Sequence, residues 1–165
     1  MARLVLVGLP GVGKSSIAQL VASSWGCAAI DTDDLVAEQV GCTAAEYVRR
    51  EGVVAFRGVE LSALRRALDS AAVVATGGGV VETPDARELL KRECTLWLDG
   101  DDDVIVDRLG DGDRPLLEVD ARHCLARLRE ERAPFYREVA RTRVDATGAP
   151  EVVAVRVRTA AEVAL

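Results

Sequence analysis

The chain has 165 residues, of which 27 are acidic and 21 are basic, so its net charge is −6 at pH 7. This length predicts a single domain over residues 1–165 that can bury a hydrophobic core. The negative charge disfavours nonspecific binding to nucleic acid or to an anionic membrane surface, so an anionic ligand needs a local site. No apolar stretch reaches the ~20 residues of a membrane span. The four cysteines form no CxxC pair, which favours a reducing cytoplasm.

Short apolar runs alternate along the chain with longer segments of helical pattern. The first run, residues 4–7, is apolar throughout, as is typical of a strand buried on both faces of a parallel sheet. Four further strands are predicted at 28–30, 72–75, 95–98 and 143–144. Because helical patterns separate them, we expect an α/β fold with three layers, α/β/α, around a five-stranded parallel sheet.

Several helix starts carry sequence signals. Thr43 is followed three residues later by Glu46, which is the capping-box pattern. Thr83 and Pro84 form the usual pair of an N-cap and a first-turn proline. Pro150 is expected to open the last helix.

Residues 8–15 read GLPGVGKS and match the phosphate-loop pattern GxxxxGK[ST]. The match lies between a predicted strand and a predicted helix, where backbone N–H groups and a helix N-terminus can bind phosphate oxygens. Lys14, one of only two lysines in the chain, would reach the outer phosphates. The Ser15 hydroxyl can bind Mg²⁺. The residues expected to contact ATP in this loop are Gly11, Val12, Gly13, Lys14, Ser15 and Ser16.

Two aspartates follow the second predicted strand, at the strand end where parallel sheets bind ligands. In extended backbone Asp31 and Asp33 point the same way, so one carboxylate could face a metal ion and the other an acceptor hydroxyl. The alternative is that Asp33 or Asp34 caps a helix that begins near Asp34.

Two further segments suggest an acceptor site for an anion. Arg57 and Glu60 stand three residues apart on a helical pattern, so the carboxylate could present the guanidinium to an anionic substrate, or the two could form an ordinary surface salt bridge. Residues 77–79 are three glycines at the end of the third predicted strand. Bare backbone at that place lets a ligand approach closely and accept hydrogen bonds from N–H groups.

The segment 110–120 is a loop of unusual composition that contains Arg114 and Pro115. It is either a mobile surface loop or a lid that closes over a ligand.

Taken in order, the motifs resemble the shikimate kinases, P-loop enzymes of the nucleoside-monophosphate-kinase-like group. The resemblance covers nearly the whole chain. It rests on GLPGVGKS at 8–15, DTD at 31–33, FRGVE at 56–60, GGG at 77–79, RPLL at 114–117 and RAPFYREVA at 132–140. The sequence departs from the family pattern at Val48, Val53 and Gly148.

The resemblance implies roles for residues on the acceptor side. Asp33 would contact the ring hydroxyls of shikimate and act as a base or as an orienting acceptor for the 3-hydroxyl. Arg57 and Arg132 would bind the shikimate carboxylate. Backbone N–H groups of Gly78 and Gly79 would also hold the substrate.

On the nucleotide side the resemblance implies that Asp31 holds Mg²⁺ together with Ser15. Arg108 and Pro150 would flank the adenine, and Arg114 from a lid at 110–120 would close on the ATP phosphates. The catalytic residues would then be Lys14, Asp33 and Arg114.

The activity implied is ATP-dependent phosphorylation of the 3-hydroxyl of shikimate, which gives shikimate 3-phosphate in aromatic amino-acid biosynthesis. The acceptor-binding segment would be about 32–60, and we expect a cytoplasmic monomer that binds neither nucleic acid nor membrane. The alternative is a related small-metabolite kinase of the gluconate or cyclitol type.

Overall fold

The computed structural model describes residues 1–109 and 121–164. Its centre is a five-stranded sheet with the order β2-β3-β1-β4-β5, in which every pair of neighbouring strands is parallel. The strands are β1 (Leu4–Val7), β2 (Ala29–Asp31), β3 (Val73–Ala75), β4 (Thr95–Asp99) and β5 (Thr142–Asp145). Each predicted strand is present, and its ends differ from the prediction by at most one residue.

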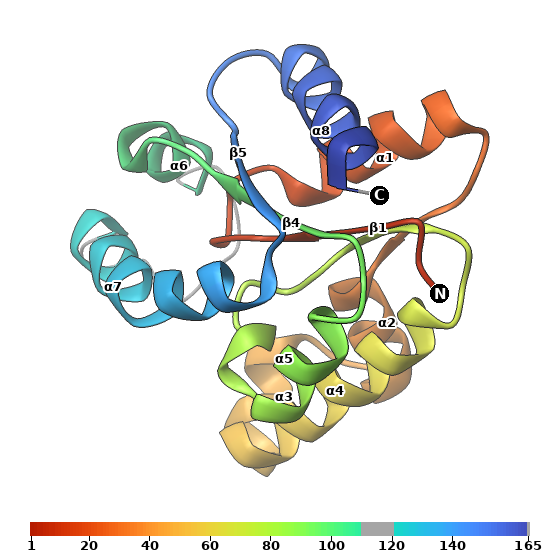
Figure 1. Cartoon of the computed structure of the whole chain (residues 1–165). Helices are drawn as coiled ribbons and strands as arrows, with labels where there is room; N and C mark the ends of the chain where they lie inside the picture. The colour runs from red at the N-terminus through yellow and green to blue at the C-terminus, as the bar shows by residue number, and fades with distance from the viewer. Residues whose placement is uncertain (110–120, 165) are drawn as a thin grey trace.

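Helices cover both faces of the sheet. α1 and α8 pack together on one face, whereas α2, α3, α4 and α5 gather on the other (Figure 1). This arrangement confirms the predicted α/β/α layering. The helices of the described residues are α1 (Lys14–Trp25), α2 (Thr32–Val40), α3 (Ala44–Glu51), α4 (Val53–Leu68), α5 (Pro84–Leu90), α6 (Asp102–Leu109), α7 (Ala121–Val139), α8 (Pro150–Ala164) and a short 3-10 helix, η1 (Val80–Glu82).

The core follows from the apolar runs. Every residue of the three inner strands β1, β3 and β4 is buried, since helices press on both of their faces. The outer strands β2 and β5 are more exposed. None of the helices in the described part combines the length and apolar character that a membrane span requires.

The predicted helix starts are mostly confirmed. Thr43 and Glu46 form the full capping box at α3, and Pro150 is the first residue of α8. Thr83 occupies the N-cap position of α5 with Pro84 after it, but its side chain makes no capping hydrogen bond. The predicted lid at 110–120 lies outside the described residues.

Candidate active site

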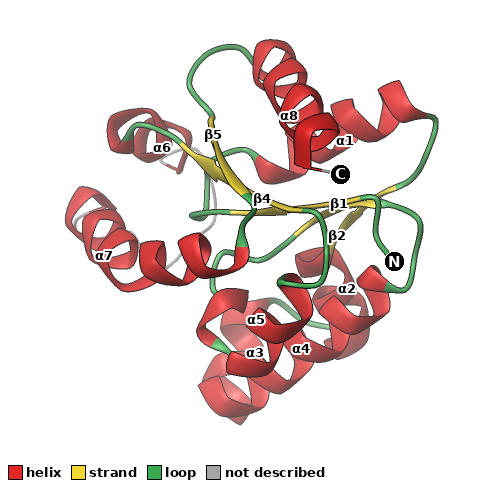
Figure 2. Ribbon diagram, in the orientation of Figure 1, coloured by secondary structure: helices red, strands yellow, loops and turns green. Residues whose placement is uncertain are grey.

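Two loops and the start of one helix meet at the carboxyl edge of the sheet. The strand order places β2, β3 and β1 side by side, so the segments that follow them are neighbours although they are far apart in sequence (Figure 2). They are the phosphate loop after β1, the aspartate pair at the end of β2 and the glycine triplet after β3. Ligands of open parallel sheets bind at this edge.

The phosphate loop has a backbone that only glycine adopts easily. Gly11 and Gly13 have φ values of 81° and 105°, and Gly13 caps α1 without any side-chain hydrogen bond to the helix N-terminus. The Lys14 side chain is only 7% exposed and curls back over the loop. Its Nζ donates hydrogen bonds to the carbonyl oxygens of Gly8 at 2.8 Å and Leu9 at 2.9 Å. The positive charge of Lys14 therefore lies at the N-terminus of α1, beside the loop, and both features suit phosphate.

Ser15, in the first turn of α1, contacts Asp31, the last residue of β2. The Ser15 hydroxyl donates a hydrogen bond to one carboxylate oxygen of Asp31. The other oxygen accepts the N–H of Asp33 at 2.9 Å, so Asp31 is the N-cap of α2. The alternative in which Asp33 or Asp34 caps this helix is wrong, because α2 begins directly at Thr32 and both residues lie in its first turn. The extended geometry expected for 31–33 is wrong for the same reason.

The Ser15 and Asp31 pair offers the donors that Mg²⁺ prefers. Both are hard oxygen ligands, and Mg²⁺ keeps several waters and takes its remaining ligands from substrate phosphates. No group of three or more His, Cys, Asp or Glu that could enclose a metal ion exists among residues 1–109 and 121–164. The two residues thus fit an ion that arrives with a nucleotide better than an ion held by protein alone.

Asp33 lies against the glycine triplet. A β-carbon built on Gly77 would stand 2.6 Å from Asp33 Oδ1 and 3.2 Å from Glu60 Oε1. The hydroxyl of Thr32 accepts the Gly77 N–H at 2.9 Å, which ties this loop to the start of α2. Only a residue without a side chain fits here, so the carboxylate of Asp33 can lie directly beside the loop.

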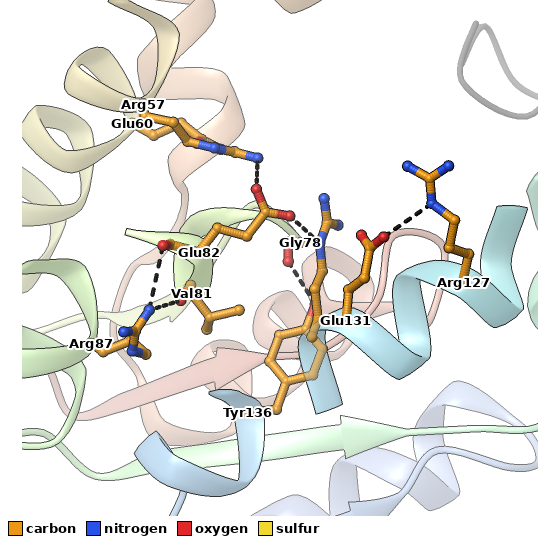
Figure 3. Close-up of polar contacts among 10 residues, drawn as sticks. Arg57, Glu60, Gly78, Val81, Glu82, Arg87, Arg127, Glu131 and Tyr136 are labelled. Atoms are coloured by element: carbon orange, nitrogen blue, oxygen red, sulfur yellow. Dashed lines mark hydrogen bonds and ion pairs between the residues drawn. The ribbon is translucent and has the colours of Figure 1, made fainter. Parts of the chain in front are cut away.

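Arg57 and Arg132 converge from α4 and α7 on a single carboxylate, that of Glu82. Arg57 pairs through Nη1 with Glu60 and through Nη2 with Glu82 (Figure 3). Arg132, which is buried, donates from Nε to the other oxygen of Glu82 at 2.7 Å. Sequence reasoning singled out both arginines and Glu60 but missed Glu82. Its only signal in the sequence is a carboxylate three residues after the glycine triplet.

The electrostatics of this cluster are those of a partly buried ion network. Burial raises the pKa of Glu60, and the nearby carboxylates of Asp33 and Glu82 add to this while Arg57 opposes it. Burial lowers the pKa of Arg57, but Glu60 and Glu82 outweigh that effect and leave the pKa above its ordinary value. The guanidinium of Arg57 therefore stays charged.

Gly78 and Gly79 are fixed by close neighbours. A β-carbon on Gly78 would lie 2.8 Å from Pro10 Cδ, and one on Gly79 would lie 2.5 Å from Arg57 Nη1. The Tyr136 hydroxyl donates to the Gly78 carbonyl at 2.6 Å (Figure 3). Burial raises the pKa of Tyr136, which keeps this phenol protonated as a donor. Tyr136, a buried residue of α7, thus holds the glycine loop in place.

Three predicted nucleotide contacts remain, namely Arg108, Pro150 and Arg114. Arg108 Nη1 donates to the Val12 carbonyl at 3.1 Å, so this side chain lies against the phosphate loop. Pro150 is exposed at the start of α8, after the carboxyl end of β5. Arg114 lies outside the described residues.

The fold and the site together define a nucleotide-dependent phosphotransferase of the P-loop class. The phosphate loop and the cluster of Arg57, Arg132 and Glu82 lie at the same end of the sheet. The family model described as "Shikimate kinase" matches residues 10–162 of the chain.

Individual proteins give the same result. A shikimate kinase of Streptomyces avermitilis is 42% identical over 163 residues, covering 97% of this chain and 95% of that protein. A shikimate kinase of Rhodococcus jostii is 38% identical over 149 residues, covering 88% of this chain and 89% of that protein.

Solved structures agree as well. The structure titled "Shikimate kinase from Acinetobacter baumannii in complex with shikimate" superimposes with a TM-score of 0.89 at 32% identity, covering 94% of this chain and 90% of that one. A gluconokinase of Sinorhizobium meliloti reaches a TM-score of 0.57 at 16% identity, which shows a shared fold alone. The chain belongs to the shikimate kinase family.

Proposed function

We propose that this protein transfers the γ-phosphate of ATP to the 3-hydroxyl of shikimate, giving shikimate 3-phosphate for aromatic amino-acid biosynthesis. The observation that carries the proposal is the pairing of two half-sites at one sheet edge. The phosphate loop with Lys14 lies at the same sheet edge as the glycine triplet, which contacts Asp33 and Arg57, and Arg132 shares Glu82 with Arg57. A rigid acceptor that carries one carboxylate and several hydroxyls matches this arrangement.

On the acceptor side, we assign the carboxylate of shikimate to Arg57 and Arg132, since charge-assisted hydrogen bonds to guanidinium are strong and directional. Backbone N–H groups of Gly78 and Gly79 hold the substrate from the glycine loop. Asp33 accepts the hydrogen bond of the 3-hydroxyl and so aims its oxygen at the γ-phosphorus. Fixing the attacking oxygen in line is the main contribution that a protein makes to phosphoryl transfer.

On the nucleotide side, the backbone N–H groups of 11–16 and the Lys14 ammonium bind the phosphates. Ser15 and Asp31 hold Mg²⁺, which neutralises phosphate charge when bound. Arg108 and Pro150 flank the adenine. Arg114, carried by a lid at 110–120, closes on the phosphates and excludes water, which is a competing acceptor.

The proposed organisation is a single domain over 1–165 with the acceptor-binding segment at about 32–60. We further propose that it works as a monomer in the cytoplasm, without nucleic-acid or membrane partners. The acidic net charge of −6 agrees with the absence of such partners.

A coupled ADP-release assay tests the proposal directly. The purified protein is given ATP and Mg²⁺ with shikimate, quinate, gluconate or AMP as acceptor. We expect turnover with shikimate, far above any turnover with the other three, and a product phosphorylated at the 3-position by phosphorus NMR. Turnover with gluconate or AMP but not with shikimate would refute the proposed function.

A further inference from the structure

The Glu82 side chain lies between the two arginines that face the acceptor pocket. One of its oxygens pairs with Arg57 Nη2 (Figure 3), and the other accepts a hydrogen bond from Arg132 Nε at 2.7 Å. A carboxylate that bridges two guanidiniums in this way makes the contacts that a bound carboxylate ligand would make. The protein therefore carries its own carboxylate where the acceptor's carboxylate is assigned.

The local charge balance shows why both carboxylates cannot share the arginines. Within the part of the chain that the structure describes, Arg57 and Arg132 share Glu82, Arg57 also pairs with Glu60, and the Arg87 guanidinium donates to the Glu82 backbone carbonyl. An anionic acceptor would bring a third carboxylate to the guanidiniums of Arg57 and Arg132. Carboxylates that lie close together in a poorly hydrated site repel each other strongly, so one of them must move away from the arginines when the acceptor binds.

Glu82 is the carboxylate that can leave the arginines. The side chain of Glu60 is 8% exposed and pairs with Arg57 along the same helix, whereas that of Glu82 is 33% exposed and ends the short helix η1. Because the Glu82 carboxylate is the more exposed of the two, it becomes hydrated when it moves away from the arginines. It also loses fewer buried contacts than the Glu60 carboxylate would lose.

We propose that Glu82 is an internal competitor for the acceptor carboxylate: it keeps Arg57 and Arg132 paired in the empty site and must be displaced when the acceptor binds. This inference rests on the proposed function and deepens it, since it names the residue that sets affinity for carboxylate acceptors. Two guanidiniums facing one pocket would repel each other without an anion between them, and Glu82 supplies that anion. An acceptor with a carboxylate replaces the ion pairs of Glu82 with ion pairs of its own to Arg57 and Arg132. An uncharged polyol cannot form such pairs, so it cannot compensate for displacing Glu82.

The effect of Glu82 on acceptor affinity depends on the fraction of molecules in which it occupies the two arginines. The apparent dissociation constant exceeds the intrinsic one by the reciprocal of the fraction of molecules in which the arginines are available. If Glu82 occupies them in about nine molecules out of ten, its removal strengthens acceptor binding about tenfold.

The test measures shikimate binding by titration calorimetry for the unaltered protein, Glu82→Gln and Glu82→Ala. We expect both variants to bind shikimate about tenfold more tightly, with the dissociation constant for ATP unchanged. The preference for shikimate over its uncharged methyl ester should widen by a similar factor. The control is Glu88→Gln on α5, which removes the same charge from an exposed pair with Lys91 and should change shikimate binding less than twofold.

Equal or weaker shikimate binding in both Glu82 variants would overturn the inference and make Glu82 a support for the arginines. A parallel change for shikimate and its methyl ester would overturn it too, because a loosened pocket affects both compounds alike. Phosphorylation of shikimate by the unaltered protein is measured first. Its absence refutes the proposed function, so that failure is recognised before the Glu82 variants are compared.

Discussion

Replacing Gly79 by alanine tests the acceptor pocket through a single methyl group. Gly79 has φ −94° and ψ −3°, a conformation that alanine adopts without strain, so the backbone gives no reason for an effect. The new β-carbon would however stand 2.5 Å from Arg57 Nη1 and 2.8 Å from Nη2. Ordinary contact between such atoms requires about 3.5 Å, so the guanidinium must retreat by roughly 1 Å.

The expected cost comes from the contact that the displaced guanidinium can no longer make with the shikimate carboxylate. A hydrogen bond to a charged group contributes about 1.5–3 kcal/mol, which corresponds to about a 10- to 150-fold rise in the KM for shikimate. The KM for ATP should stay within about twofold of its original value, because Lys14 and the phosphate loop are untouched. Steady-state kinetics with each substrate varied in turn measures both values.

Gly58→Ala is the matched control. Gly58 lies inside α4 next to Arg57, and no atom stands within 4 Å of a β-carbon built there. This variant should keep the shikimate KM and raise the free energy of unfolding by about 0.5–1 kcal/mol, as alanine does inside helices. If Gly79→Ala keeps the original shikimate KM, or raises the KM for ATP equally, then Arg57 does not bind the acceptor as we infer.

Three further variants address the rest of the site. Lys14→Arg should lower kcat by about 100-fold or more, because a broad guanidinium cannot replace the compact ammonium between phosphates; single-turnover kinetics checks this. Asp31→Asn should leave stability unchanged, since asparagine also caps helices, but should raise the Mg²⁺ concentration for half-maximal rate about tenfold or more. Tyr136→Phe should lower the free energy of unfolding by about 0.5–1.5 kcal/mol in urea denaturation, since the partly buried Gly78 carbonyl loses its hydrogen bond from the phenol.

Each of these expectations has an outcome that contradicts it. A near-normal kcat in Lys14→Arg would show that the compact ammonium of Lys14 is not required to stabilise the transition state. An unchanged Mg²⁺ dependence in Asp31→Asn would place the metal elsewhere. Normal stability in Tyr136→Phe, together with an unchanged shikimate KM, would show that the glycine loop holds its shape without the phenol.

Much of the fold could be predicted because its signals are local. The strand at 4–7 is apolar at every position, and burial on both sheet faces makes that pattern unambiguous. The capping box of Thr43 and Glu46 is likewise a contact between residues three apart. The start of α2 was predicted wrongly, because Asp31, Asp33 and Asp34 are all good caps and only the end of β2 decides among them.

The sequence by itself determined the phosphate-loop motif and the parallel sheet, since the signal of each lies in consecutive residues. It also predicted acceptor-binding roles for Arg57, Arg132 and the glycine triplet, and these roles stay predictions. Only the tertiary structure decided how these motifs meet. Glu82 joins Arg57, 25 residues away, to Arg132, 50 residues away, and Tyr136 reaches Gly78 across 58 residues. Such contacts arise because parallel strands bring distant loops to one edge, and no local pattern records them.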